Sequence, residues 1–443
     1  MSPELKGFIL VSVLKMILVF TVILVGVALL TLMERKVSAW MQNRRGPNRV
    51  GWAGLLQPAA DGLKNILKEE TNPAQATRGL FLLAPALSFI PALLTSAVIP
   101  FAAPLELNFD DLGTALGSIP VLGIVLGPVG DLLQLLFGRI AHHGRMPMVV
   151  ADLPIGFLFV LAIGSMGVYG IALAGWSSNS KYSLLGGLRA SAQMISYEVA
   201  MGMSLIPVLL LAGNVSFSAI IAEQQGTTWF ILPLFLSFFL FLVAGFAETN
   251  RLPFDLPEAE SELITGYHTE YSAMKFSMFF IAEYANVVTV SAMIATLFFG
   301  GWDIPFTRWD ETGTLPAVLA SHLFFFGKTF FWIFFVMWIR WTLPRFRYDQ
   351  LMALGWKFMI PLALTYVMLV AVLIWVLQGP LGIADARLRA LILFGVNLVL
   401  AILVFWLLDR GLIVSGSEAR RRKVMAGRTE STLAGRERAP VTG

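Results

Sequence analysis

Stretches of mainly apolar residues recur along this chain and alternate with short polar segments. Nine of them are long, and they cover residues 9–33, 79–101, 153–176, 191–213, 229–247, 273–300, 322–341, 359–378 and 390–408. A helix needs about 20 mainly apolar residues to cross the hydrocarbon core of a bilayer. The pattern therefore predicts an all-α, polytopic transmembrane protein in which residues 1–414 form one membrane domain with about nine spans.

A shorter segment, residues 57–69, has a different pattern. Pro58 stands where the first helical residue is expected, a position that proline tolerates well. Leu63, Ile66 and Leu67 share one face of the helix that follows, and Lys64 lies on another. This spacing predicts an amphipathic helix that lies along the membrane interface.

Basic residues orient the predicted spans. The segment between the first two spans holds Arg35, Lys36, Arg44, Arg45, Arg49, Lys64, Lys68 and Arg78. With nine spans, the basic loop after the seventh span and the Arg-rich tail fall on the same side. Because cytoplasmic loops are enriched in Lys and Arg, this side is predicted to be cytoplasmic, with the N-terminus outside and the C-terminus cytoplasmic.

Two regions fall outside the regular pattern. Residues 110–148 are apolar in part but rich in glycine and proline. One further crossing there would move every later basic loop to the outside, so we expect a loop or surface-lying insert on the outer side. Residues 415–443 are rich in Arg, Gly and Ser, and we expect a basic, disordered cytoplasmic tail.

Composition narrows the class of protein further. Of the 443 residues, 57% are hydrophobic and 14% are charged, whereas an ordinary soluble domain has about 25% charged residues. Cysteine is absent, which excludes thiolate-held iron–sulfur clusters and Cys-based zinc sites in this chain. The net charge of +4 is small, so a nucleic-acid-binding role has no support.

Carboxylates inside the predicted spans are the first candidates for chemistry. Glu198 lies in the fourth span, Glu283 in the sixth, and Glu248 ends the fifth. An ionised side chain at the centre of a span costs at least ~2.5–3.5 kcal/mol. Neither Glu198 nor Glu283 has a basic residue within one helical turn, so each needs a distant partner or a proton. Such groups can pass protons.

The loop between the fifth and sixth spans adds further acids. Asp255, Glu258, Glu260, Glu262 and Glu270 occur within sixteen residues, and Arg251 is the nearby base. Closely spaced carboxylates titrate as a coupled set, which suits stepwise proton uptake. A solvated acidic loop is the alternative, although interleaved Leu and Phe residues favour a loop that folds back into the protein. A metal site formed by Glu258, Glu262 and His268 is conceivable but less favoured.

Two long motifs, residues 34–70 and 248–286, resemble the membrane subunit that closes the quinone chamber of respiratory complex I. In bacteria this family is the H subunit of NADH:quinone oxidoreductase. Residues 151–199 and 338–357 also resemble it, so the similarity extends from about residue 9 to 378, apart from the insert. The resemblance implies a subunit of a proton-translocating enzyme, with no complete active site in this chain.

The resemblance also implies ligands, partners and a location. Quinone is the implied substrate, and no flavin, iron–sulfur cluster or metal is expected in this chain. The implied partners are the peripheral-arm subunits of the quinone site, small membrane-arm subunits and antiporter-like subunits. The implied location is the bacterial inner membrane, with quinone access near the first span, the amphipathic helix and the sixth span.

Site residues follow from the same resemblance, position by position. The implied proton relay consists of Glu198, Glu248, Asp255, Glu258, Glu260, Glu262, Glu270 and Glu283. The implied quinone chamber is formed or shaped by Glu34, Arg35, Arg44, Arg45, Asp61, Lys64, Arg251, Phe254, Arg340, Arg345 and Arg347.

Three rivals stay open at this point. A homologous membrane subunit of an energy-converting hydrogenase would bind no quinone. A secondary ion transporter would act alone, but such proteins often have repeated halves, and no convincing repeat is visible here. A purely structural membrane anchor would not explain Glu198 and Glu283.

Overall fold

The computed structural model describes residues 3–107, 144–255, 264–305, 307–383 and 385–409, and most of these residues are helical. The long helices are α1 (Pro3–Met41), α3 (Arg78–Leu94), α6 (Gly156–Ser177), α7 (Lys181–Ala212), α11 (Ala273–Phe298), α12 (Leu315–Thr342), α14 (Ile360–Gln378) and α15 (Ala386–Asp409). The shorter helices are α2 (Gln57–Leu67), α8 (Phe217–Gly226), α9 (Phe235–Glu248) and α13 (Tyr348–Ala353). Single 3₁₀ turns cover Trp52–Gly54, Thr95–Val98, Gly266–His268 and Trp309–Thr312, and a π-helical turn, Leu354–Met359, joins α13 to α14.

The all-α, polytopic fold class is confirmed. Among the described residues, eight helices are long and apolar enough to cross a membrane. Helices also lie over all nine predicted segments, but the fifth is short. The span count of nine therefore stays a prediction.

The fifth segment, predicted as 229–247, differs from expectation. Its helix, α9, begins only at Phe235 and has 14 residues, which gives it a length of about 21 Å. Pro233 lies just before this helix, and proline cannot donate the backbone hydrogen bond that a helix interior requires. Residues 230–234 form turns instead.

A buried glutamine on α8 supports this irregular segment. The Gln224 side chain accepts hydrogen bonds from the backbone N–H groups of Phe230 (3.2 Å) and Gly300 (3.0 Å), and donates to the Thr296 carbonyl (2.9 Å). Buried backbone groups outside regular structure need such partners. Gln224 therefore joins the turn before α9 to the end of α11.

Two short strands frame the predicted insert. Strand β1 (Ala102–Leu107) pairs antiparallel with β2 (Gly144–Met148), and Leu107 lies opposite Gly144. The chain therefore leaves and re-enters the described part at the same place. Residues 110–143 of the predicted insert and the predicted tail, 415–443, lie outside the described residues.

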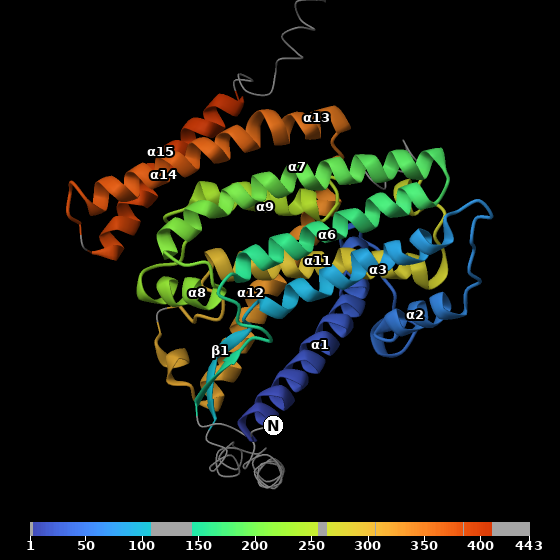
Figure 1. Ribbon diagram of the computed structural model, residues 1–443, viewed down its shortest axis with the longest axis horizontal. Coiled ribbons are helices and arrows are strands. Elements are labelled where there is room, and N and C mark those ends of the chain that lie inside the picture. Colours follow the sequence, from blue (N-terminus) through green and yellow to red (C-terminus); the bar gives the residue numbers. More distant parts are fainter. Residues whose placement is uncertain (1–2, 108–143, 256–263, 306, 384, 410–443) are drawn as a thin grey trace, which may run out of the picture.

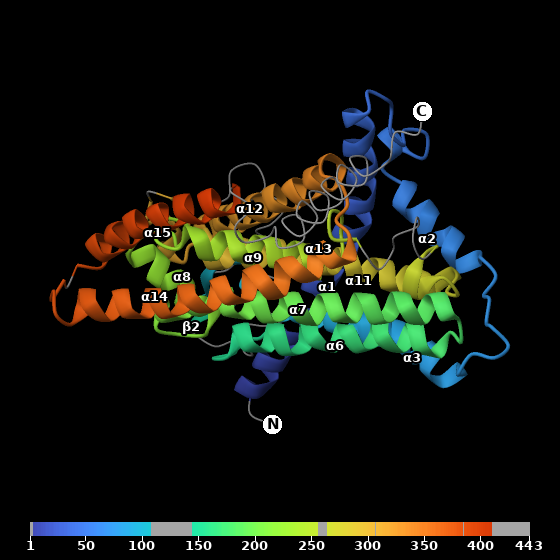
Figure 2. The same ribbon diagram turned by 90° about the horizontal axis from the view of Figure 1, so that it is seen from above.

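The long helices form one bundle (Figures 1 and 2). Figure 1 shows α3, α6, α7 and α14 running nearly parallel along the long axis, while α1 is steeply tilted. Helices α3, α6, α7 and α9 pack in sequence against one another, and α11 packs against α3 and α12. The two ends of the bundle differ, because α2 lies at one end and β1 and α8 lie at the other (Figure 1). We call these the α2 end and the β1 end.

Helix α15 is attached to the bundle by a buried asparagine. The Asn397 amide donates to the Pro233 carbonyl (2.7 Å) and accepts from the Tyr366 hydroxyl of α14 (2.6 Å). Asn397 is fully buried. Helix α15 thus satisfies a backbone carbonyl in the turn that precedes α9.

Candidate functional site

A buried group of charged side chains lies where α1, α11, α12 and the loop after α9 meet. Arg251, in that loop, is at its centre: its Nη1 lies 2.8 Å from Glu34 Oε2, and its Nε lies 2.5 Å from Glu283 Oε1. Arg251 is 3% exposed and Glu34 is 5% exposed. The chain therefore brings together three charged residues that are far apart in sequence.

Two further side chains complete this charge cluster. The Tyr284 hydroxyl donates to Glu34 Oε2 at 2.5 Å, and its ring lies 3.9 Å from the Arg251 guanidinium carbon. Arg340 of α12 pairs with the other oxygen of Glu34. Two carboxylates thus face two guanidinium groups, so the cluster is formally neutral. We refer to Glu34, Arg251, Glu283, Tyr284 and Arg340 as the charge cluster.

Arg251 stays charged in this setting. Burial by itself disfavours the charged guanidinium, but the Glu283 and Glu34 carboxylates outweigh it and raise the pKa of Arg251 above its ordinary value. A permanent positive charge here holds both carboxylates close. Any new charge that develops nearby will compete for the same partners.

The loop that carries Arg251 is fixed by Gln193 of α7. The Gln193 amide donates to the carbonyls of Ala247 (2.8 Å) and Phe254 (2.7 Å). The buried Phe254 ring packs against Tyr197 and Phe346, with ring centroids 5.7 and 5.6 Å away. Gln193 was not among the predicted site residues, because an uncharged amide in an apolar helix gives no distinctive signal.

Asp255, at the end of the described part of this loop, faces the segment that follows α12. Its carboxylate accepts from Arg345 Nη2 at 2.9 Å and is nearly buried, whereas Arg345 is partly exposed. The pair therefore connects the loop to the surface of the α2 end. The neighbouring predicted acids, Glu258, Glu260 and Glu262, lie outside the described residues.

A small cavity lies between Glu283 of the charge cluster and Glu248, another of the predicted acids. It has a volume of about 30 Å³, and Glu283, Asn286 and Glu248 are among its lining residues. This is enough space for about one water molecule, provided that polar partners are present. Its other lining residues come from α3, α6, α7 and α11, from the loop after α9 and from the 3₁₀ turn before α11.

Glu248 faces this cavity with an unsatisfied atom. Its Oε2 is buried, and no described residue hydrogen-bonds to it. Glu198 of α7 is close enough for the two carboxylates to interact electrostatically. The acids Glu283, Glu248 and Glu198 thus form a series across α11, α9 and α7.

The remaining predicted residues lie at the surface of the α2 end. Arg35 pairs with Asp61 of α2 at 2.6 Å, and both are partly exposed. Glu270 is half-buried in the turn before α11. The other basic residues are exposed or half-buried and do not belong to the charge cluster: Arg44, Arg45, Lys64 and Arg347.

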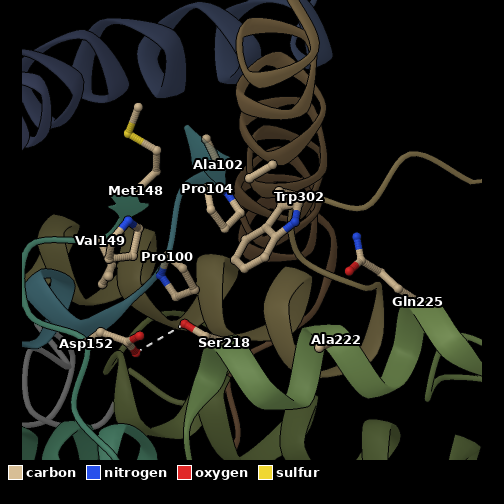
Figure 3. Close-up of a pocket in the computed structure, with 12 residues that line it drawn as sticks. Pro100, Ala102, Pro104, Met148, Val149, Asp152, Ser218, Ala222, Gln225 and Trp302 are labelled. Carbon is tan, nitrogen blue, oxygen red and sulfur yellow. Dashed lines mark hydrogen bonds between the residues drawn. The ribbon is translucent and has the colours of Figure 1, made fainter. Parts of the chain in front are cut away.

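A larger cavity, of about 410 Å³, lies at the β1 end (Figure 3). Figure 3 shows Trp302, Pro100, Pro104 and Asp152 around it, with a hydrogen bond of 3.1 Å from the Ser218 hydroxyl to Asp152. No predicted site residue is among the described residues that line it. The candidate chemistry is therefore concentrated at and near the α2 end, away from this cavity.

Comparison with known proteins decides the family. A family model described as NADH dehydrogenase matches residues 14–371, which include every residue of the charge cluster. The chain belongs to the NADH dehydrogenase family. This finding confirms the resemblance seen in the sequence motifs.

Individual relatives are similar to this chain over most of its length. The three named here are H subunits of NADH-quinone oxidoreductase. The chain is 48% identical over 374 residues to one from Koribacter versatilis, covering 83% of this chain and 98% of that relative. It is 46% identical to one from Geobacter metallireducens, covering 82% of this chain and 95% of that relative. It is also 46% identical to one from Leptospira biflexa, covering 81% of this chain and 93% of that relative.

Membership of the NADH dehydrogenase family bears on the alternative functions that the sequence left open. Relatives named as subunits of NADH-quinone oxidoreductase do not favour a role in a hydrogenase. Such names also imply association with other subunits of complex I rather than action alone. Helix α15 begins beyond residue 371, the last residue that the NADH dehydrogenase family model matches.

Proposed function

We propose that this chain is the quinone-side membrane subunit of a proton-translocating NADH:quinone oxidoreductase. In this role the charge cluster and the loop after α9 form one wall of the quinone chamber. Glu283, Glu248 and Glu198 then transmit the effect of quinone reduction into the membrane through changes in their protonation. The relatives' names support the enzyme class, and the arrangement of acids supports the coupling role.

The observation that carries this proposal is the double ion pair of Arg251. One guanidinium holds Glu34 of α1 and Glu283 of α11, and Glu283 shares a cavity with Glu248. A buried charge with two competing partners is sensitive to any third charge. The cluster can therefore convert a change of charge in the chamber into a change at Glu283.

Quinone reduction supplies such a change. The headgroup takes up two electrons and two protons to form the quinol, so negative charge develops there until protons arrive. Developing negative charge attracts Arg251 and Arg340 and loosens their hold on the carboxylates. Glu283 then takes up or releases a proton through the cavity toward Glu248 and Glu198. Glu258, Glu260 and Glu262, with Asp255, are proposed as responders in the loop.

The proposed orientation follows the basic residues. Exposed Arg44, Arg45 and Arg347 lie at the α2 end, which we assign to the cytoplasm of a bacterial inner membrane, with the N-terminus outside. The peripheral arm would dock at this end and supply the electrons. The change in protonation would pass from the acids of this chain to antiporter-like and small membrane-arm subunits.

The test is Glu283→Gln in the intact complex. This substitution keeps the shape but removes the titrating group, so NADH-driven proton translocation should fall about tenfold or more while assembly persists. Glu223→Gln, on α8 at the β1 end, is the matched control and should translocate normally. Full proton pumping by the Glu283→Gln complex would refute the relay.

A further inference from the structure

The connector between α2 and α3 is fastened to the start of α11. Thr71 donates from its backbone N–H (2.9 Å) and its hydroxyl (2.8 Å) to Ser272 Oγ, and Ser272 donates to the Glu69 carbonyl at 3.4 Å. Lys275 donates to Asn72 Oδ1 at 2.5 Å and pairs with Glu70 Oε2 at 3.1 Å. We call these contacts, between residues 69–72 and the pair Ser272 and Lys275, the latch.

The side chains of Ser272 and Lys275 do not stabilise the start of α11. Ser272 is the N-cap of α11, where a serine normally accepts a backbone hydrogen bond from the first turn, yet it makes no such bond. Lys275 lies in the first turn, where the helix dipole disfavours a positive charge. Ala273, between them, has a φ of 54°, which is uncommon for a residue with a side chain. These features are explained by contact with the connector.

Helix α2 depends on such contacts for its position. It has 11 residues, and none of them is buried. Leu63, Ile66 and Leu67 are exposed, which fits a helix lying at the membrane surface. Helix α2 packs against both α1 and α11. With no buried side chain of its own, it is held by the Arg35 pair on one side and by the latch at its C-terminal end.

An aromatic row leads from the latch to the charge cluster. Phe276 follows Lys275 directly, and Phe280 and Tyr284 come four and eight residues later, on the same face of α11. The ring centroids are 6.0 Å apart from Phe276 to Phe280 and 4.9 Å apart from Phe280 to Tyr284. Phe276 and Phe280 are half-buried, and Tyr284 donates to Glu34. The row is an apolar track that ends at polar groups, as an amphiphile with a polar head and a long tail requires.

We propose that the latch sets the position of α2 against α11 and thereby controls the access of the hydrophobic tail of the quinone to this aromatic row. The proposal rests on the proposed function. Ser272 and Lys275 are then positioning residues: they act on the tail through α2 and do not touch the headgroup. Weakening the latch should change the handling of long-tailed quinones and leave the headgroup chemistry intact.

The experiment compares quinones in the intact complex. Lys275→Met keeps the unbranched, flexible shape of the side chain but removes the ammonium group. We expect its KM for a quinone with a long isoprenoid tail to rise about threefold or more. Its kcat and KM for a tail-less benzoquinone should stay unchanged. Ser272→Ala, which removes the acceptor of Thr71, should shift the same KM by a smaller factor. An unchanged KM for the long-tailed quinone in Lys275→Met would overturn the proposal.

A reversible cross-link provides the rescue. This chain has no cysteine, so Thr71→Cys with Ser272→Cys introduces one defined pair, at side chains that already meet. In the Lys275→Met background, oxidation should restore the KM for the long-tailed quinone, and a reductant should reverse this. Thr71→Cys alone is the control and should not respond. A disulfide verified by mass spectrometry that fails to restore the KM would contradict the latch.

These outcomes separate the two proposals. If Lys275→Met lowers turnover equally with both quinones, the latch proposal fails while the proposed function stands. If the wild-type complex oxidises NADH without reducing either quinone, the proposed function itself fails.

Discussion

At the scale of single residues, burial separates the ion pairs that contribute most to stability from those that contribute little. Arg251 holds Glu34 and Glu283 at 3% exposure, whereas Arg35 and Asp61 meet at a partly exposed surface. Removing one partner of a buried pair costs ~3–5 kcal/mol because the other charge is left uncompensated. An exposed pair contributes only ~0–1 kcal/mol.

Arg251→Gln should therefore be far more damaging than Arg35→Gln. We expect Arg251→Gln to lower the thermal stability of the complex and to reduce quinone reductase activity about tenfold or more. Arg35→Gln should leave thermal stability close to wild type. The measurement is a thermal melt of the purified complex together with NADH:quinone turnover. Equal effects of the two variants would show that burial does not control these pairs.

At the scale of elements, the chain compensates for one short helix. Helix α9 has 14 residues, and the turn before it leaves backbone groups to be satisfied. Gln224 and Asn397 supply these partners from α8 and α15. Since α15 lies beyond the family match, part of this support comes from a segment that the family model does not include.

Asn397→Leu tests this support. The variant leaves the Pro233 carbonyl and the Tyr366 hydroxyl without their partner, and an unsatisfied buried group costs ~1–3 kcal/mol. We expect a lower melting temperature with unchanged quinone affinity. Val399→Leu, at an exposed position on the same helix, is the control. A melting temperature equal to wild type would argue against a structural role for Asn397.

At the scale of the whole molecule, the sequence predicts the positions of the helices well. It predicts the contacts between side chains of different helices and loops poorly. Apolar runs predict the long helices because membrane burial imposes a length. The break before α9 was missed, although Pro233 was a visible signal. Glu283 could be predicted to need a partner elsewhere, but its pairing with Arg251 could not, because the loop must first fold back. Glu34 lies 217 residues from Arg251 in the sequence, a pairing that no local pattern reveals.

Our central proposal is that the acids form a continuous series from the charge cluster into the membrane. Glu248 is the middle member, since it lines the cavity with Glu283 and interacts with Glu198. The most direct test is the number of protons translocated per NADH by the Glu248→Gln complex in sealed vesicles. We predict that coupled translocation falls about tenfold or more in this variant, with the complex still assembled. Translocation at the wild-type ratio and rate would contradict the proposed series.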